Sequence, residues 1–315
     1  MNNIENKKLN TMRKGSLLVF LGAVLWSTNA PFFKILQVDS YLAIAIRAAI
    51  AGILCLPSLR HGKIHFNCAL AVMLCSYTTL CVGIVFAIRN TSVNIATGMQ
   101  YTSPLLIFCL GVFRKKIRPT FRRHWPMLLL LGGLVVSMLS GSEAVTKKGN
   151  LWALSTAASF TLMTLSSKKS GADNPLGIVC LNSLFCAVAV ALLFVPKPLA
   201  EQLKAISYPE WLSLIYLGVF QIGAGYALYY SGLRQISPGR AAMIAPVEMV
   251  LGPVWVALFV REYPDWIAVL GSVLIVAGVL GEVIAGQKSS AYVPEKSVTK
   301  REEKENSTAE IKAAP

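Results

Sequence analysis

The sequence predicts an all-α, polytopic membrane protein, and its composition and charge spacing are the reasons. Of 315 residues, 55% are hydrophobic and only 14% are charged, whereas roughly a quarter of an average soluble domain is charged. The few charges cluster, which leaves long uncharged runs. A helix needs about 20 apolar residues to cross the hydrocarbon core, and in lipid it satisfies every backbone amide internally. These runs lack the polar–apolar alternation of membrane β-strands.

Ten such segments follow one another along the chain. Two of them contain a single charge, which is Arg47 in Ser40–Leu59 and Glu248 in Ala241–Val260. We therefore expect ten transmembrane helices. The eight uncharged segments lie between Lys14 and Lys34, Lys63 and Arg89, Arg89 and Arg114, Arg123 and Glu143, Lys148 and Lys168, Asp173 and Lys197, Glu210 and Arg234, and Asp265 and Glu282.

The basic residues predict the orientation. If the N-terminus is cytoplasmic, 22 of the 30 Lys and Arg residues fall in cytoplasmic segments, as the positive-inside rule requires. We expect a multi-pass protein of the cell (inner or plasma) membrane, with residues 1–14 as a cytoplasmic N-terminus and 287–315 as a disordered cytoplasmic tail. The basic run Arg114–Arg123 is then a topological anchor, and no nucleic-acid partner is expected.

The two halves of the chain resemble each other, which predicts repeats over residues 15–142 and 149–286. Five helices are an odd number, so the second repeat enters the membrane from the opposite side, and transporters commonly have such inverted repeats with a site between them. The matches at an offset of 134 are Gly15 with Gly149, Leu17 with Leu151, Lys34 with Lys168, Asp39 with Asp173, Leu42 with Leu176 and Ile44 with Ile178; those at 145 are Arg89 with Arg234, Ser92 with Ser237, Ala96 with Ala241 and Pro119 with Pro264.

Four segments resemble EamA-type transporters of the drug/metabolite transporter superfamily. They are GAVLWSTNAPFFK (Gly22–Lys34), AIRAAIAG (Ala45–Gly52), Tyr101–Thr120 and Val247–Gly281. The resemblance covers about residues 13 to 285. It implies ten helices that carry amino acids, metabolites or related solutes, commonly outward. The family's acidic residue after the ninth helix is present as Glu262, whereas the first copy has Ile117 at the matching place.

Two ionisable residues inside the predicted helices are candidates for function, because charges at membrane depth are costly. Arg47 is interpreted either as an anchor for an anionic solute group or as a structural arginine. Glu248 is interpreted either as a proton-coupling carboxylate, since burial resists ionisation, or as a structural partner of Arg47. Both alternatives stay open for each residue.

Aromatic and polar side chains at membrane depth complete the candidate site. Trp26 and Trp255 lie in mid-helix, where they could wall a cavity by stacking or cation–π contact or simply pack. The other candidates can form hydrogen bonds in a polar interior, and they are Asn29, Tyr77, Tyr101, Asn182, Tyr226 and Tyr230.

These features favour a secondary transporter for a small metabolite, working by alternating access and exporting its solute. The alternatives are a non-transporting receptor or scaffold and an intramembrane enzyme. An enzyme is not expected, because the three histidines, His61, His65 and His124, lie near the surface without metal-site spacing. The sequence indicates no catalytic residues, no metal and no cofactor. The expected partners are a small-molecule solute and the lipid bilayer, and both a monomer and a homodimer are compatible with the small-residue faces of helices five and ten.

Overall fold

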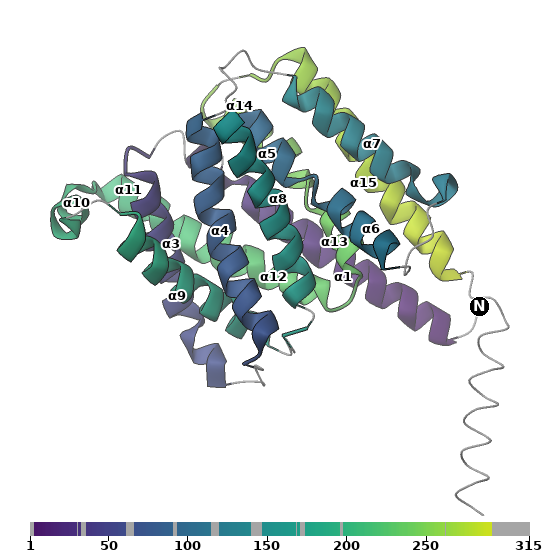
Figure 1. The fold of residues 1–315 in the computed structure, drawn as a ribbon, viewed down its shortest axis with the longest axis horizontal. Helices are drawn as coiled ribbons and strands as arrows, with labels where there is room; N and C mark the ends of the chain where they lie inside the picture. The colour runs from purple at the N-terminus through teal and green to yellow at the C-terminus, as the bar shows by residue number, and fades with distance from the viewer. Residues whose placement is uncertain are drawn as a thin grey trace, which may run out of the picture.

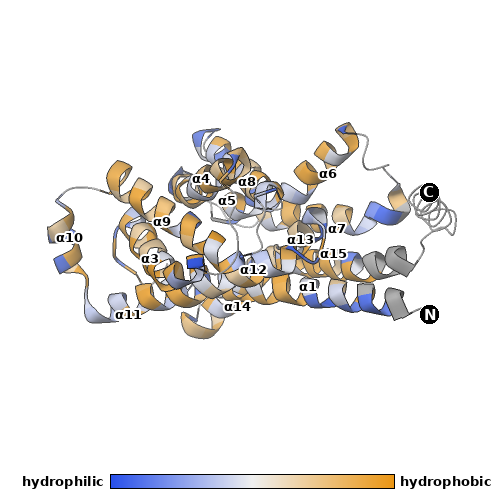
Figure 2. Ribbon diagram, turned by 90° about the horizontal axis from the view of Figure 1, so that it is seen from below, coloured by the Kyte–Doolittle hydropathy of each residue, from blue (hydrophilic) through white to orange (hydrophobic). Residues whose placement is uncertain are grey.

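The computed structural model is a bundle of helices packed side by side (Figure 1). It describes residues 3–29, 31–32, 36–60, 66–90, 93–114, 120–139, 147–167, 169–170, 174–195, 198–261 and 263–291. Within these ranges the regular structure is helical and contains no strand, which confirms the predicted fold class. Hydrophobic residues dominate the helices, and hydrophilic residues gather at the N-terminal part of α1 (Figure 2).

The described residues of the first half form six α-helices and one 3-10 turn, and the second half continues in the same manner. The first set is α1 (Asn3–Ser27), α3 (Ser40–Cys55) with the 3-10 turn Leu56–Arg60, α4 (Cys68–Asn90), α5 (Val93–Gln100), α6 (Ser103–Phe113) and α7 (Phe121–Met138). The second set is α8 (Lys147–Ser167), α9 (Pro175–Leu193), α10 (Leu199–Ala205), α11 (Tyr208–Tyr216), the π-helix η2 (Leu217–Ala224), α12 (Gly225–Leu233), α13 (Pro238–Ile244), α14 (Val247–Phe259) and α15 (Trp266–Ala291).

Several helical spans are long and apolar enough to cross a membrane, so the chain is a multi-pass membrane protein. The described residues contain seven, which are Ser40–Arg60, Cys68–Ala87, Asn94–Phe113, Pro175–Leu193, Tyr208–Leu233, Pro238–Phe259 and Trp266–Ile284. The full count of ten stays a prediction. The other three expected spans fall in α1, α7 and α8. Four basic residues occupy the first half of α1, the apolar part of α7 is only Arg123–Met138, and α8 is rich in Ser and Thr.

Two expected boundaries differ from the structure. Helix α1 begins at Asn3, so the described part of the N-terminal segment continues the first span as a helix. Helix α15 runs to Ala291, so residues 287–291 are helical where a disordered tail was expected. Residues 3–14 contain neither proline nor glycine, and a helix propagates easily from an existing turn. Residues 292–315 of the predicted tail lie outside the described residues.

Two of the membrane spans are broken at matching positions. The first break lies at Tyr101 and Thr102, between α5 and α6, and the second lies at Ala245 and Pro246, between α13 and α14. The two breaks are separated by about the 145-residue offset between the halves. Proline follows or occupies each break, as Pro104 and Pro246, and proline cannot donate the backbone hydrogen bond that continues a helix.

The packing of the helices has a regular pattern between the halves. Helix α7 packs against α15, α3 against α9, α4 against α8, and α1 against α12. By the offset between the halves, α1 corresponds to α8, α3 to α9, α4 to α12 and α7 to α15. Exchanging each helix for its counterpart turns the pair α1–α12 into α8–α4 and leaves the pairs α3–α9 and α7–α15 unchanged. The most extensive neighbours therefore come from opposite halves of the sequence, and α7 and α15 lie side by side in Figure 1.

Glycine permits the close approach of α7 and α15. A Cβ atom built on Gly133 would lie 2.7 Å from the Gly271 carbonyl oxygen, and one on Gly271 would lie 2.8 Å from the Gly133 carbonyl oxygen. The two backbones are thus in direct contact, as in other small-residue helix interfaces in membranes. The small-residue faces of these two helices pack within the chain.

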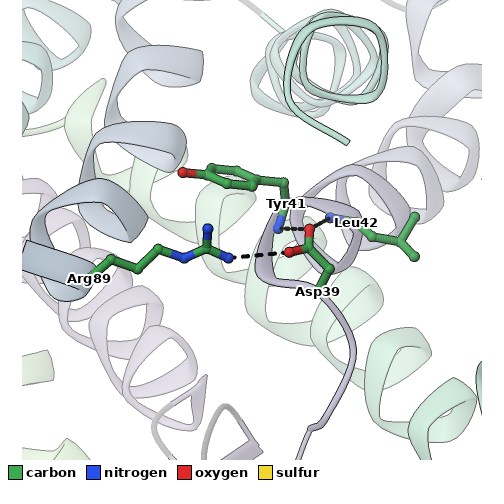
Figure 3. Close-up of polar contacts among 4 residues, drawn as sticks. All are labelled: Asp39, Tyr41, Leu42 and Arg89. Carbon is green, nitrogen blue, oxygen red and sulfur yellow. Dashed lines mark hydrogen bonds and ion pairs between the residues drawn. The ribbon is translucent and has the colours of Figure 1, made fainter. Parts of the chain in front are cut away.

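Contacts at one end of the bundle join segments that the charge analysis places outside. Asp39 caps α3 by accepting hydrogen bonds from the backbone amides of Tyr41 and Leu42, at 3.0 and 3.1 Å. Its other oxygen pairs with Arg89 Nη2 at 3.2 Å (Figure 3), and the Arg89 guanidinium lies 4.7 Å from the centre of the Tyr41 ring. The Arg89 side chain is 48% exposed, and such pairs contribute about 0–1 kcal/mol.

Contacts at the opposite end join segments that the charge analysis places inside. Asn67 Nδ2 donates to the Lys169 carbonyl oxygen at 3.2 Å. Asn174, the N-cap of α9, donates from Nδ2 to the Ser58 carbonyl oxygen at 2.6 Å. Each of these contacts links the two halves, and each agrees with the predicted alternation of loops between the two sides.

Candidate functional site

The two helix breaks meet near the middle of the bundle. Tyr101, in the first break, donates a hydrogen bond from its hydroxyl to Glu248, in the first turn of α14 after the second break. The N-terminus of a helix favours a negative charge, because its unpaired amides give it a partial positive charge. Tyr101 is 2% exposed, and Glu248 is only partly buried. A carboxylate is therefore held at the junction of the halves with one side open to its surroundings.

Arg47 lies on α3 beside this junction and is 6% exposed. Its Nη1 atom donates a hydrogen bond to Asn29 Oδ1 at 3.0 Å, so these two predicted site residues are neighbours. Arg47 also lies within electrostatic range of Glu248. A Cβ atom on Gly218 would lie 2.9 Å from the Arg47 carbonyl oxygen, so the second half of the chain packs directly against this part of α3.

Six aromatic rings form a cluster next to these charges, and we call it the aromatic cluster. Its centre is Trp26, whose ring lies 4.6 Å from that of Tyr226, 4.9 Å from Tyr229 and 6.4 Å from Phe160. The rings come from α1, α4, α8 and α12, so both halves contribute. We define the cluster as Trp26, Tyr77, Phe160, Tyr226, Tyr229 and Tyr230, and its further ring contacts include Tyr77 with Tyr226 at 5.1 Å and Tyr226 with Tyr230 at 6.0 Å. Tyr101 adjoins the cluster, with its ring 6.2 Å from that of Phe160.

Hydrogen bonds fix part of the aromatic cluster. Tyr230 accepts at its hydroxyl from Asn182 Nδ2 at 2.8 Å. The hydroxyls of Tyr229 and Thr164 lie 2.8 Å apart and form a second hydrogen bond. These two contacts tie α12 to α9 and α8. The candidates Asn182, Tyr226 and Tyr230 are therefore brought together with Trp26 and Tyr77.

Trp255 is the sequence candidate that the structure separates from this group. Its Nε1 atom donates to Ser27 Oγ at 2.8 Å, and its ring lies 6.3 Å from that of Phe259. Among the described rings, none of the aromatic cluster is its neighbour. The rotation of α14 turns it toward the end of α1, and its depth in the membrane stays a prediction.

The aromatic cluster also contains two residues that sequence analysis missed, Phe160 and Tyr229. Both had a signal. Phe160 stands 134 residues after Trp26, which is the offset between the halves, and the two matched rings contact each other. Tyr229 follows Tyr226 by three residues and therefore lies on the same face of a helix.

The π-helix η2 lies directly before α12. A π-helix is wider than an α-helix, and such segments often occur at functional sites. It holds Gln221, which is 7% exposed, just ahead of Gly225 and Tyr226. A Cβ atom on Gly225 would lie 2.8 Å from Trp26 Nε1. Because glycine has no side chain, the edge of the Trp26 ring can pack directly against the backbone at this position.

A groove of about 290 Å³ lies elsewhere, between α14 and α15. Its lining is almost entirely apolar and includes Pro253, Val254, Val269 and Val273. Val254, Val269 and Val273 are among the exposed hydrophobic residues, so this groove faces the lipid. Within the described residues, no group of three or more His, Cys, Asp or Glu side chains is arranged to hold a metal ion.

An all-helical, multi-pass bundle with polar side chains between its two halves is an architecture that membrane transporters commonly have. Two stretches of the chain, residues 13–139 and 147–283, match the model of the EamA-like transporter family. The chain belongs to this family.

Relatives among known proteins agree with this assignment. The chain is 26% identical over 195 residues to YxxF, an uncharacterized transporter of Bacillus subtilis, a match that covers 60% of this chain and 61% of YxxF. It is 23% identical over 293 residues to YicL, an uncharacterized inner membrane transporter of Salmonella typhimurium, covering 86% of this chain and 96% of that protein. A solved crystal structure superposes with a TM-score of 0.72 at 19% identity, covering 87% of this chain and 98% of the other. At this identity the superposition shows the fold alone.

Proposed function

We propose that this protein is a secondary transporter that moves a small metabolite, an amino acid or a similar solute, out of the cell by alternating access. The solute binds between the halves at the aromatic cluster, Arg47 and Glu248. Both termini lie in the cytoplasm, in agreement with the positive-inside charge distribution. The chain carries out no catalysis and needs no cofactor.

The hydrogen bond from Tyr101 to Glu248 is the observation on which this proposal rests. It connects the break of one half to the break of the other half at the centre of the bundle. A motion that separates the two breaks would lengthen or break this contact. A group bound at Glu248 is thereby coupled to the conformation of the whole bundle.

Glu248 is the proton-coupling residue in this mechanism. In one facing state the carboxylate takes up a proton, and in the other it releases the proton and accepts from Tyr101. Arg47, which donates a hydrogen bond to Asn29, lies within electrostatic range of this carboxylate. Solute and proton therefore compete for, or share, the same central region.

Two inverted five-helix repeats, over residues 15–142 and 149–286, provide the two facing states. The exchange pattern of helix packing and the two separate family matches support this arrangement. The two repeats are copies of one unit in opposite orientations, and each can take the conformation of the other. Exchanging their conformations gives a second state of the protein with nearly the same energy, so one state is open to each side of the membrane.

A flux assay tests the proposal. Proteoliposomes containing the full chain are loaded with radiolabelled leucine, phenylalanine or threonine, and efflux is compared with that from protein-free liposomes. Efflux of at least one of these solutes that saturates with concentration supports a transporter. If none of the three leaves faster than from protein-free vesicles, export of these amino acids is excluded, and the receptor or scaffold alternative gains weight.

A further inference from the structure

Four buried polar atoms beside the aromatic cluster make no hydrogen bond among the described residues. They are Trp26 Nε1, the Tyr77 hydroxyl, Asn182 Oδ1 and Gln221 Oε1. All four side chains are more than nine-tenths buried, with exposed fractions of 3%, 1%, 1% and 7%. A buried polar atom without a partner is energetically costly, so four such atoms near one cluster indicate a place where partners arrive with a ligand.

The ring contacts link three of these four atoms to one another. Trp26 and Tyr77 both contact the ring of Tyr226, at 4.6 and 5.1 Å. Asn182 donates a hydrogen bond to the hydroxyl of Tyr230, whose ring lies 6.0 Å from that of Tyr226. Gln221 precedes Tyr226 on the same continuous helix, in η2. Three of the four side chains are therefore linked to the Tyr226 ring, directly or through Tyr230, and Gln221 lies in the helical segment that leads into it.

The chemistry of these atoms is mixed and neutral. An indole N–H can only donate, an amide oxygen can only accept, and a tyrosine hydroxyl does either. The charged groups nearby already have partners, because Arg47 donates to Asn29 and Glu248 accepts from Tyr101. The four atoms beside the aromatic cluster all belong to uncharged side chains.

We infer that the aromatic cluster binds a flat, uncharged ring whose edge carries both a hydrogen-bond donor and an acceptor, such as a heteroaromatic ring or an aromatic amide. The inference rests on the proposed function and narrows its solute. Aromatic side chains stack on flat rings. The ligand enters between Trp26 and the tyrosines of α12 as the two halves move, and its edge supplies the partners that the four atoms lack.

Benzamide is the probe, because its flat ring bears an amide that both donates and accepts. Cyclohexanecarboxamide has the same amide on a puckered ring, and benzoate has the same flat ring with a negative charge and no donor. Binding to the purified full-length protein is measured by the rise in melting temperature and by the change in tryptophan fluorescence. We expect benzamide to bind roughly tenfold more tightly than either comparison compound.

Conservative variants localise the binding. Trp26→Phe and Tyr77→Phe each keep an aromatic ring and remove one polar group, and each is expected to weaken benzamide binding several-fold. Tyr41→Phe is the matched control, because the Tyr41 hydroxyl is also buried and unpartnered among the described residues. Its ring packs against Phe86 and Phe194, outside the aromatic cluster, so this variant should bind benzamide like the wild type.

The outcomes separate this inference from the proposed function. Equal binding of benzamide and cyclohexanecarboxamide, no binding of benzamide, or no effect of Trp26→Phe and Tyr77→Phe would each overturn it. Tighter binding of benzoate would also overturn it and would indicate that Arg47 anchors an anion. The flux assay is independent of these results. If the protein transports a solute but benzamide binding does not depend on the aromatic cluster, the protein is a transporter for another class of ligand. If benzamide binds but no solute is transported, the receptor alternative is favoured.

Discussion

Tyr101 and Glu248 are 147 residues apart in the sequence and form one hydrogen bond at the centre of the bundle. Each stands at a break in a membrane helix, and the two breaks belong to different halves of the chain. Because a broken helix leaves backbone groups without their usual partners, such breaks are expected only where protein or a polar cavity surrounds them. The pair therefore marks the polar centre of this protein.

Removing the charge at this pair should change the coupling of transport. We expect Glu248→Gln to abolish uphill movement of solute driven by a pH gradient and to retain downhill exchange, because glutamine cannot carry a proton. Tyr101→Phe should weaken the response to the gradient while keeping it, since the carboxylate remains. Uptake into proteoliposomes is measured with and without an imposed gradient. Wild-type flux that ignores the gradient would refute proton coupling.

Arg47 should tolerate no neutral replacement. Arg47→Ala leaves Asn29 without its donor and removes a buried charge, so we expect transport to be lost. Arg47→Lys keeps the charge but cannot present the flat, multi-donor guanidinium, so folding should be retained and solute binding weakened. Melting temperature and solute binding are measured for both variants. A fully active Arg47→Ala would remove Arg47 from the site.

The predicted orientation can be tested by cysteine labelling of a cysteine-free version of the full chain. Single cysteines in Lys147–Gly149 and in Ala200–Lys204 should react with a membrane-impermeant reagent added outside intact cells. Cysteines at positions 116 and 300 should react only after the cells are opened. Labelling of Lys116→Cys from outside intact cells would reverse the assigned orientation.

The contact between α7 and α15 predicts a difference between two adjacent glycines. A Cβ atom on Gly133 would meet Gly271 backbone at 2.7 Å, whereas one on Gly132 would meet nothing within 4 Å. We expect Gly133→Ala to destabilise the protein by about 1–3 kcal/mol, because backbone must shift to admit the methyl group. Gly132→Ala should be neutral or slightly stabilising, since alanine favours helix. The melting temperatures of the two variants test this prediction. Equal melting temperatures for Gly133→Ala and Gly132→Ala would contradict the close contact between α7 and α15.

The sequence by itself determined the all-α class, the long apolar spans and the offset between the halves. These are local properties, because a run of apolar residues crosses a membrane whatever its neighbours are. The same reasoning placed Arg47, Glu248 and Trp26 inside helices, where the structure has them.

Only the tertiary structure decided which of these side chains meet. It joined Tyr101 to Glu248 and Arg47 to Asn29, added Phe160 and Tyr229 to the aromatic cluster, and turned Trp255 away toward Ser27. Helices that are apolar on all sides carry little information in their periodicity about which face is inward. Their rotation is set by close packing between partners such as Gly133 and Gly271, and that packing exists only once the whole bundle has assembled.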